Sequence, residues 1–298
     1  MEHMTALISA FARSYHYRHH SEWIFADRLA EKMLTEEEYA GISRNMSEGI
    51  SYFAPGFKGT KDDALRLIVD HQLSPPVLAR SAFCERAIDN AVWIGCDQIV
   101  LFACGYDTFA LRTENRKLTV FELDRPEMMA DKQKRIARGD FAPLCRVESI
   151  GCDLSRPFWK EELIKKGFDV NRRAFGSLLG ISYYLSNEDF ARLINWISAL
   201  WREGSSICFD YPFSKDGSVS RRGRELAAAA GEPMKAVYSY DELEDMLSEA
   251  GFLIYEHLND DEATEAFFQN HNIKESEHRM EAPDGIGYCL AVKKRAEK

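Results

Sequence analysis

The stretch Gln98-Ile-Val-Leu-Phe-Ala-Cys-Gly-Tyr-Asp-Thr-Phe-Ala-Leu-Arg112 decides the fold that we expect for this chain. Residues 99–102 form a short apolar run without alternation, which is typical of a strand that helices cover on both faces. Gly105 then provides a bend and a close approach of the backbone. The side chain of Asp107 or Thr108 can cap the helix that follows, because its oxygen accepts free N–H groups of the first turn.

The charge in this turn indicates the kind of ligand that it suits. Open α/β sheets bind ligands beyond the carboxyl ends of their strands. A pyrophosphate there prefers bare N–H groups and the positive end of a helix, but Asp107 places a carboxylate at that position. A ligand with a sulfonium and a free ammonium therefore fits better than NAD. Residues 103–108 also lack the complete G-x-G-x-x-G pattern of dinucleotide-binding turns.

Length, composition and charge narrow the possible partners. The 298 residues, 45% of them hydrophobic, are enough for one core with one appendage. A formal net charge of -10 disfavours nucleic acid and anionic membranes, so we expect a small-molecule or peptide substrate, with the oligomeric state open. The seven cysteines form no C-x-x-C pair and predict reduced thiols in a cytoplasmic protein. No apolar run approaches membrane-spanning length, and the N-terminus shows no signal-peptide pattern.

The chain divides into a helical part and an alternating part. Residues 1–95 lack strand alternation and predict an N-terminal helical cap or lid, with helices at 4–17, 24–34, 62–73 and 77–94. From residue 96 to residue 298, strand, turn and helix alternate, which predicts a mostly parallel, Rossmann-like α/β sheet. The expected strands are 99–102, 118–123, 146–150, 174–179, 206–211, 252–258 and 287–292. We expect the last strand to be antiparallel, and residues 212–237 to form a basic, Ala-rich helical lid inserted into the core.

Several motifs follow one another in a fixed order along most of the chain. They are Arg13 with Ile24-Phe25-x-Asp27-x-x-Ala30; Ala79-Arg80; Gln98-Ile-Val-Leu with Gly105-x-Asp107-Thr108 and Arg112; Phe121-Glu122-Leu123-Asp124-x-Pro126 with Lys132; Asp153-Leu154; and Tyr184-Leu185-Ser186-x-Glu188. In this order they resemble class I S-adenosylmethionine-dependent methyltransferases, specifically the leucine carboxyl methyltransferase-like group, whose bacterial members are tied to polyketide tailoring.

The resemblance implies a role for particular residues in binding S-adenosyl-L-methionine. Arg80 would hold the cofactor carboxylate, since a guanidinium grips a carboxylate with two hydrogen bonds. Gly105 would lie against the methionine part. Asp124, 19 positions later, would accept the ribose hydroxyls at the end of the second strand. Asp153 and Leu154 would contact the adenine, whose exocyclic amine can donate to a carboxylate.

Two positions depart from the pattern of the family. The first glycine of the turn is Ala103 here, and the acidic residue expected after the fourth strand is Leu179. Asp107 is our candidate to neutralise the amino group of the cofactor in place of that acid. The sequence Asp210-Tyr211-Pro212-Phe213 is similar to the Asp-Pro-Pro-Tyr box of amino-group methyltransferases, but it has one proline and follows the fifth strand, so we set it aside.

The expected reaction is methyl transfer to oxygen. Transfer from a sulfonium mainly requires that the acceptor is aligned and water excluded, and a carboxylate acceptor needs no base, whereas a phenol or alcohol does. We expect an O-methyltransferase acting on a carboxylate or hydroxyl of a small metabolite or peptide. Tyr183 and Tyr184 would position the substrate, although core packing explains Tyr183 equally well. The alternatives are a catalytically silent binding protein, motivated by Ala103 and Leu179, and, less favoured, an NAD-dependent reductase.

Two clusters of basic residues have more ordinary interpretations. His16, His19 and His20 have a spacing found in metal sites, but we favour a solvated helix end and expect no metal, because no cysteine or second histidine cluster accompanies them. Arg221, Arg222 and Arg224 could face an anionic substrate, although a run of charges is more often a solvated face.

Overall fold

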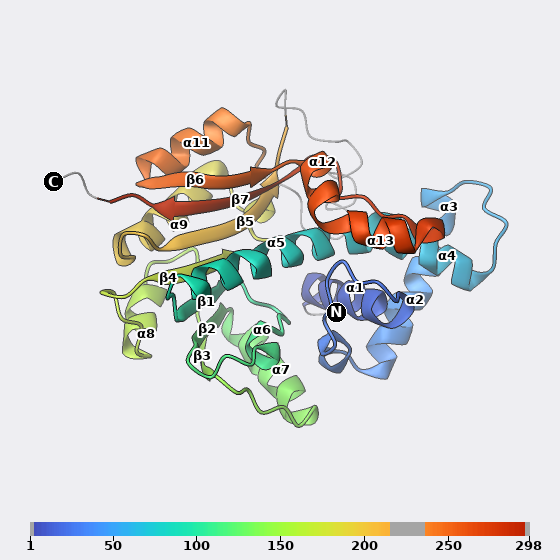
Figure 1. Cartoon of the computed structure of the whole chain (residues 1–298). Coiled ribbons are helices and arrows are strands. Elements are labelled where there is room, and N and C mark those ends of the chain that lie inside the picture. Colours follow the sequence, from blue (N-terminus) through green and yellow to red (C-terminus); the bar gives the residue numbers. More distant parts are fainter. Residues whose placement is uncertain (1–2, 215–235, 296–298) are drawn as a thin grey trace.

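The core of the molecule is a seven-stranded sheet in which the strands follow the order β3-β2-β1-β4-β5-β7-β6. The computed structural model describes residues 3–214 and 236–295 (Figure 1). All neighbouring strands are parallel except β7, which runs antiparallel to both β5 and β6. The strands are β1 Gln98–Phe102, β2 Thr119–Asp124, β3 Arg146–Gly151, β4 Ala174–Leu178, β5 Ser206–Pro212, β6 Phe252–Leu258 and β7 Ile286–Lys293. The mostly parallel sheet and its antiparallel closing strand are as predicted.

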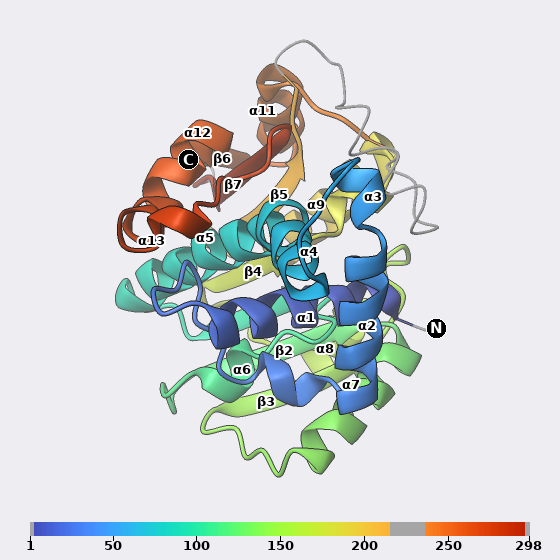
Figure 2. The same ribbon diagram turned by 90° about the vertical axis from the view of Figure 1, so that its right-hand side faces the viewer.

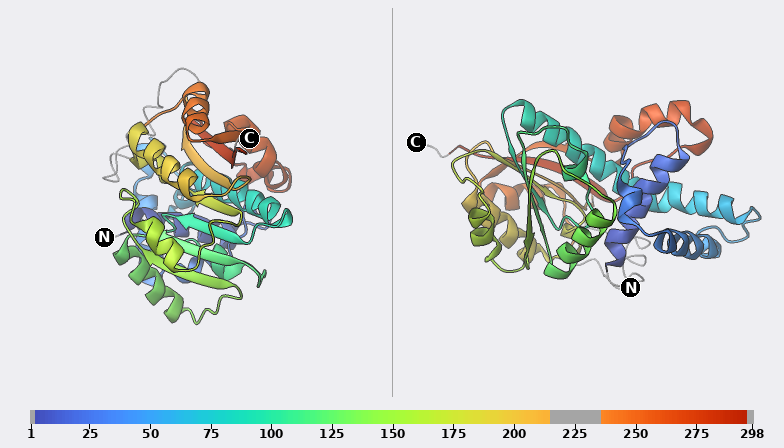
Figure 3. Two further views of the ribbon diagram at one scale, coloured as in Figure 1. Left: turned by 90° about the vertical axis from the view of Figure 1, so that its left-hand side faces the viewer. Right: turned by 90° about the horizontal axis from the view of Figure 1, so that it is seen from below.

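Helices cover both faces of this sheet, as buried parallel strands require (Figure 3). The long helix α5 packs on one face, against side chains of β1, β4, β5 and β7. Helices α8, α9 and α11 pack on the opposite face, where the aromatic rings of Phe102 and Trp159 meet edge to face. The helices around the sheet are α5 Ser74–Trp93, α6 Phe109–Arg112, α7 Pro126–Arg138, α8 Trp159–Lys165, α9 Asn187–Leu200 and α11 Tyr240–Glu249.

The N-terminal helices lie beside the carboxyl ends of the parallel strands, on the right of Figure 1 and in front in Figure 2. They have their own apolar cluster, which Tyr106 and Met128 join from the sheet side. A Cβ built on Gly105 would lie 3.3 Å from the Cβ of Ala6, so α1 directly contacts the turn after β1. These elements are α1 Met4–His19, η1 Ala30–Met33, α2 Glu36–Glu48, α3 Ile50–Phe53, α4 Lys61–Ile68 and η2 Val69–Leu73.

The segment between β6 and β7 is helical and reaches back to the N-terminal helices. Its elements are α12 Asp260–Ala263, η4 Thr264–Phe268, α13 Gln269–Lys274 and η5 Ser276–His278. Lys274 forms an ion pair with Glu22 at 2.7 Å. The long charged excursion that the sequence indicated between the last two strands is therefore a packed part of the molecule.

The N-terminal part differs from the sequence prediction in three places. Residues 24–34 form no α-helix; only the short helix η1 forms there, because Phe25 and Asp27 are both held in the interior by contacts with distant residues. The helix α2 was missed, although Thr35 and Glu38 form a capping box at its start. The expected break between the helices at 62–73 and 77–94 is absent, because the prolines after Ser74 lie in the first turn of α5, where no N–H is needed from proline.

The remaining sequence predictions have mixed outcomes. The seven cysteines are free thiols, six of them buried. No helix in residues 3–214 and 236–295 is long and apolar enough to cross a membrane. Residues 215–235, which carry most of the expected lid and the three arginines near residue 222, lie outside the described residues. The division into a cap at 1–95 and a core at 96–298 stays a prediction.

Candidate functional site

The turn after β1 has the backbone shape that the sequence indicated. Gly105 has φ of 46°, and Ala103 has φ of 50°, a left-handed conformation that is unusual for alanine. The N–H of Gly105 donates to Oδ2 of Asp124 at 2.8 Å, and the N–H of Arg125 donates to Oδ1 at 2.7 Å. The carboxylate at the end of β2 therefore lies directly beside the glycine turn after β1.

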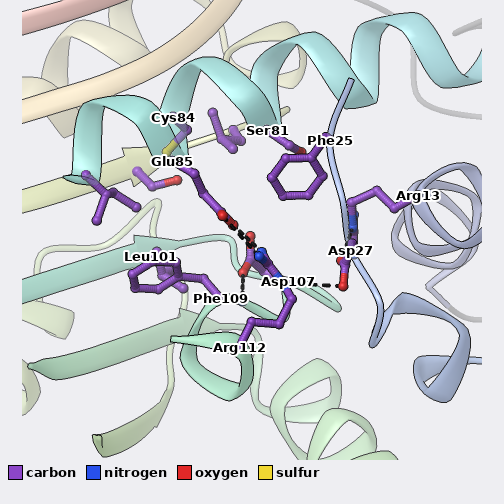
Figure 4. Close-up of a pocket in the computed structure, with 13 residues that line it drawn as sticks. Arg13, Phe25, Asp27, Ser81, Cys84, Glu85, Leu101, Asp107, Phe109 and Arg112 are labelled. Carbon is purple, nitrogen blue, oxygen red and sulfur yellow. Dashed lines mark hydrogen bonds and ion pairs between the residues drawn. The ribbon is translucent and has the colours of Figure 1, made fainter. Parts of the chain in front are cut away.

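Asp107 caps the short helix that follows this turn. Its Oδ1 accepts the N–H of Phe109 at 2.7 Å, so Asp107 and not Thr108 provides the cap. Its side chain also lines a small pocket between α5 and the strands β1 and β4, with room for about one water molecule (Figure 4). Leu179 and Glu85 line the same pocket. Asp107 therefore lines the same pocket as Leu179, the residue that stands in place of the family's acid.

A buried network of ions supports the turn from the side of the N-terminal helices. Asp27 accepts from Nε of Arg13 at 2.8 Å and from the hydroxyl of Thr108 at 2.8 Å. Arg112 lies 3.3 Å from Asp27 and also pairs with Glu85. Burial by itself would raise the pKa of Asp27, but Arg13 and Arg112 outweigh it and hold that pKa below its usual value. The network keeps α1 and residue 27 attached to the turn.

Arg80 projects from α5 toward the end of β4. Its Nη2 donates to the hydroxyl of Ser9 at 3.1 Å, and its Nη1 lies 3.6 Å from Oδ2 of Asp210. A Cβ on Gly180 would lie 2.8 Å from this Nη1, so the guanidinium packs against the bare backbone of the turn after β4. Burial opposes the charge, but the carboxylate of Asp210 outweighs it and raises the pKa of Arg80.

The tyrosines after β4 differ in exposure. Tyr183 is 6% exposed and donates its hydroxyl to Oδ2 of Asp210 at 2.9 Å. Burial, assisted by Asp210, raises the pKa of Tyr183 well above its usual value, so its hydroxyl stays protonated. Tyr184 is half-buried beside it. Contact of either ring with a substrate stays a prediction.

Asp153 and Leu154 follow β3. Asp153 is exposed, and its Oδ1 accepts from the N–H of Ser155 at 2.9 Å and from its hydroxyl at 2.7 Å. Leu154 packs against the apolar cluster on the α8 side of the sheet. The residues chosen from the sequence thus all lie along the carboxyl ends of β1 to β4. Sequence reasoning missed Glu85, and it set aside Asp210.

The expectation of a solvated histidine cluster is wrong for two of its three residues. His16 and His20 are buried, and His19 alone is exposed. Nδ1 of His20 lies 2.7 Å from Glu275, and Nε2 lies 3.1 Å from Asp70. His20, Glu275 and His271 have ligand atoms within 4.8 Å of one another, but both ring nitrogens of each histidine already face oxygens of the protein. We therefore interpret the cluster as a hydrogen-bonded network.

The fold and this edge of the sheet define a class I S-adenosylmethionine-dependent methyltransferase. The strand order with an antiparallel β7, the glycine turn after β1 and the acid at the end of β2 are its elements. The residues present are compatible with this cofactor: Arg80 is a partly buried cation and Asp124 is a carboxylate at the end of β2, groups that can pair with a carboxylate and accept from ribose hydroxyls.

Comparison with known proteins identifies the family. The chain belongs to the leucine carboxyl methyltransferase family, whose model matches residues 6–198. It is 36% identical over 304 residues to "Putative S-adenosyl-L-methionine-dependent methyltransferase YktD" of Bacillus subtilis, and the match covers 98% of both chains. A methyltransferase-type relative of Parafrankia is 29% identical over 170 residues, which cover 53% of this chain and 54% of that protein. The cofactor of this chain is thus S-adenosyl-L-methionine, and its reaction class is methyl transfer.

Solved structures agree with the fold. A DUF574 family protein from Streptomyces avermitilis superposes with a TM-score of 0.60 at 13% identity and covers 97% of both chains. A methyltransferase-type structure from Thermobifida fusca has a TM-score of 0.55 at 14% identity and covers 90% of this chain and 94% of that chain. At these identities the likeness extends to the fold alone.

Proposed function

We propose that this protein is an O-methyltransferase that methylates a carboxylate or hydroxyl of a small metabolite or peptide. The observation that carries the proposal is the order of groups along the carboxyl edge of the sheet. Arg80 lies beside the end of β4, Gly105 follows β1, Asp124 ends β2, and Asp153 follows β3. The methionine part of the cofactor needs a cation and a bare backbone, and the ribose and the adenine each need a hydrogen-bond acceptor. The groups along this edge follow that order.

Each residue along this edge then has a distinct task. Arg80 binds the cofactor carboxylate, Asp107 neutralises the ammonium, and Asp124 accepts from the ribose hydroxyls. Asp153 and Leu154 hold the adenine, while Ala103 and Gly105 shape the backbone beside the methionine part. When bound, the cofactor supplies a methyl group on a positively charged sulfur.

The acceptor binds between the end of β4 and the N-terminal helices. Tyr183 and Tyr184 position it, and the helices of residues 1–95 exclude water from this edge. Two observations support oxygen as the acceptor atom. The name of the family contains a carboxyl group, and β4 is followed by Leu179-Gly180-Ile181-Ser182 and not by the Asp-Pro-Pro-Tyr box of amino-group methyltransferases. A polyketide-type metabolite is the small-molecule acceptor that the bacterial resemblance favours.

The competing proposal is a catalytically silent binding protein, based on Ala103 and Leu179. The conformation of Ala103 argues against it, because at φ of 50° alanine adopts the shape that a turn glycine would provide. Asp107 lines the same pocket as Leu179 and offers a carboxylate there. With Ala103 and Leu179 in place of the family's residues, the turn after β1 thus keeps its shape and the pocket keeps a carboxylate.

The test is product formation with a matched acceptor panel. The protein is incubated with S-adenosylmethionine carrying a labelled methyl group, and with small phenols, hydroxy acids, aliphatic carboxylates and peptides with free carboxyl termini. Mass spectrometry should find a methyl ester or methyl ether, and the Asp124→Asn variant should form far less of it. Methylation only at nitrogen or carbon would contradict the proposal, and cofactor binding without any product would favour the silent alternative.

A further inference from the structure

Asp210, at the carboxyl end of β5, organises the turn after β4. Its side chain is 1% exposed. Oδ1 accepts the N–H of Gly180 at 2.7 Å, and Oδ2 accepts the hydroxyl of Tyr183 at 2.9 Å. Its backbone carbonyl accepts the hydroxyl of Ser182 at 2.7 Å. One residue of β5 therefore holds both ends of the segment from Gly180 to Tyr183.

Asp210 also faces the guanidinium of Arg80. The distance of 3.6 Å between Nη1 and Oδ2 is that of an ion pair and is longer than a hydrogen bond. Arg80 is 17% exposed at its side chain and packs on Gly180, whose φ of 68° and absent Cβ make this approach possible. The positive and the negative group thus both contact Gly180, and these contacts leave some N–H groups of Arg80 unused.

The surroundings explain why a carboxylate is needed at this place. A buried guanidinium is costly without a counter-charge, and its removal leaves an uncompensated ion. Tyr183 is protonated and supplies no negative charge. Tyr288 is opposite Asp210 in the β5–β7 register, and its buried hydroxyl has no hydrogen-bond partner in the described part of the structure. Asp210 is therefore the charge that holds Arg80 beside the turn after β4.

We propose that Asp210 is a positioning residue for the amino-acid end of the cofactor, which it serves by orienting Arg80 and the Gly180–Tyr183 turn. This rests on the proposed function, in which Arg80 binds the cofactor carboxylate. Asp210 acts on ligands that carry an α-amino-acid group and is indifferent to ligands that end at the nucleoside. Asp210 belongs to the sequence Asp210-Tyr211-Pro212-Phe213, which we set aside as a catalytic box. The inference gives Asp210 a different role, in positioning Arg80.

The experiment compares two probes that differ in the amino-acid end. Isothermal titration measures the affinity of S-adenosylhomocysteine and of 5′-methylthioadenosine for the wild-type protein, Asp210→Asn and Asp124→Asn. Loss of a charged partner predicts that Asp210→Asn weakens S-adenosylhomocysteine by about tenfold or more, and 5′-methylthioadenosine by less than about twofold. Asp124→Asn should weaken both probes, because both contain the ribose.

Two further variants separate positioning from general damage. Tyr183→Phe removes one hydrogen bond but keeps the charge of Asp210, so it should change the affinity for S-adenosylhomocysteine by less than about threefold. Asp245→Asn makes the same chemical change on the exposed side of α11 and should leave both affinities as in the wild type. Thermal melts of each variant confirm that the proteins compared are folded.

The outcomes are distinct. Equal weakening of both probes by Asp210→Asn would show a general structural role and overturn the inference, as would wild-type affinity for S-adenosylhomocysteine in that variant. If the wild-type protein binds neither probe, the site described under the proposed function is itself refuted, and Asp210 has no ligand to serve. Binding in the wild type with selective loss in Asp210→Asn supports both.

Discussion

Two buried networks join the N-terminal helices to the rest of the molecule, and they use different ions. At the turn after β1, Asp27 pairs with Arg13 and Arg112, groups whose charges persist across the physiological pH range. At the far end of α1, His20 lies between Asp70 and Glu275. The first network supports the turn after β1 with permanent charges, whereas the second links α1 to the helical segment before β7 through a titratable ring. One attachment of the N-terminal helices is therefore expected to be independent of pH and the other to depend on it.

The largest expected effect comes from breaking the first network. Asp27→Asn leaves two buried guanidinium groups without their shared carboxylate, and should lower the free energy of unfolding by about 3–5 kcal/mol. Denaturant unfolding followed by circular dichroism measures this loss. Asp245→Asn, an exposed control with the same chemical change, should cost less than about 0.5 kcal/mol. A loss below about 1 kcal/mol in Asp27→Asn would mean that the network contributes little.

A smaller effect is expected from the second network. His20→Gln removes a ring that bridges two carboxylates, and should cost about 1–3 kcal/mol in the free energy of unfolding near pH 6. His19→Gln on the exposed side of the same helix is the matched control and should cost less than about 0.5 kcal/mol. Equal losses in the two variants would contradict the buried bridge.

The pH dependence sharpens the comparison. Burial by itself would lower the pKa of His20, but Asp70 and Glu275 outweigh it and raise that pKa above 6.5. The stability that His20 contributes is therefore fully present below pH 6.5 and is lost as the pH rises through the folded-state pKa. The difference between wild type and His20→Gln should shrink from about pH 6 to about pH 9, while the cost of Asp27→Asn stays constant across that range. Parallel curves for the two variants would refute this distinction.

Low pH weakens the same attachment by protonating Glu275. Burial by itself would raise the pKa of Glu275, but hydrogen bonds from His20 and from the backbone of Ser21 and Glu22 outweigh it and lower that pKa to about 2. Its contribution is present above its unfolded pKa of about 4.3 and is lost as the pH falls toward 2. Glu275→Gln should therefore lower the midpoint of urea unfolding at pH 7 and have little effect near pH 2. A constant difference at both pH values would contradict this assignment.

The smallest effect concerns Ala103. Glycine relieves the strain of a positive φ but adds freedom to the unfolded chain, so Ala103→Gly should change the free energy of unfolding by less than about 1 kcal/mol. The affinity for S-adenosylhomocysteine should change by less than about threefold, because the turn already has its shape. A gain of about a hundredfold would instead show that alanine obstructs the cofactor.

The contrast between these regions also explains how far the sequence could predict the structure. The strands around Val100 and Phe121 were evident because apolar runs between turn residues are local patterns. The capping box of Thr35 and Glu38 was a usable signal for α2 that we missed. The helix predicted at residues 24–34 was wrong because contacts of Asp27 with Arg13 and Thr108, and not the local sequence pattern, determine the backbone there.

The site shows the same division. The positions of Gly105, Asp107 and Asp124 at one edge of the sheet could be predicted because each lies at or just after the end of a strand. The role inferred for Asp210 depends on β4 and β5 being neighbours, which places its carboxylate on the turn after β4. The burial of His20 likewise depends on Glu275, 255 positions away. These contacts between distant residues cannot be predicted from spacings in the sequence.

The central claim, that the carboxyl edge between Arg80 and Asp153 binds the methyl donor, is tested most directly by titrating S-adenosylmethionine into the wild-type protein and Asp124→Asn. The account predicts saturable binding of one equivalent to the wild type, and an affinity lower by about tenfold or more in the variant, which loses the acceptor of the ribose hydroxyls. Absence of binding at millimolar ligand, or equal affinity in the two proteins, would contradict it.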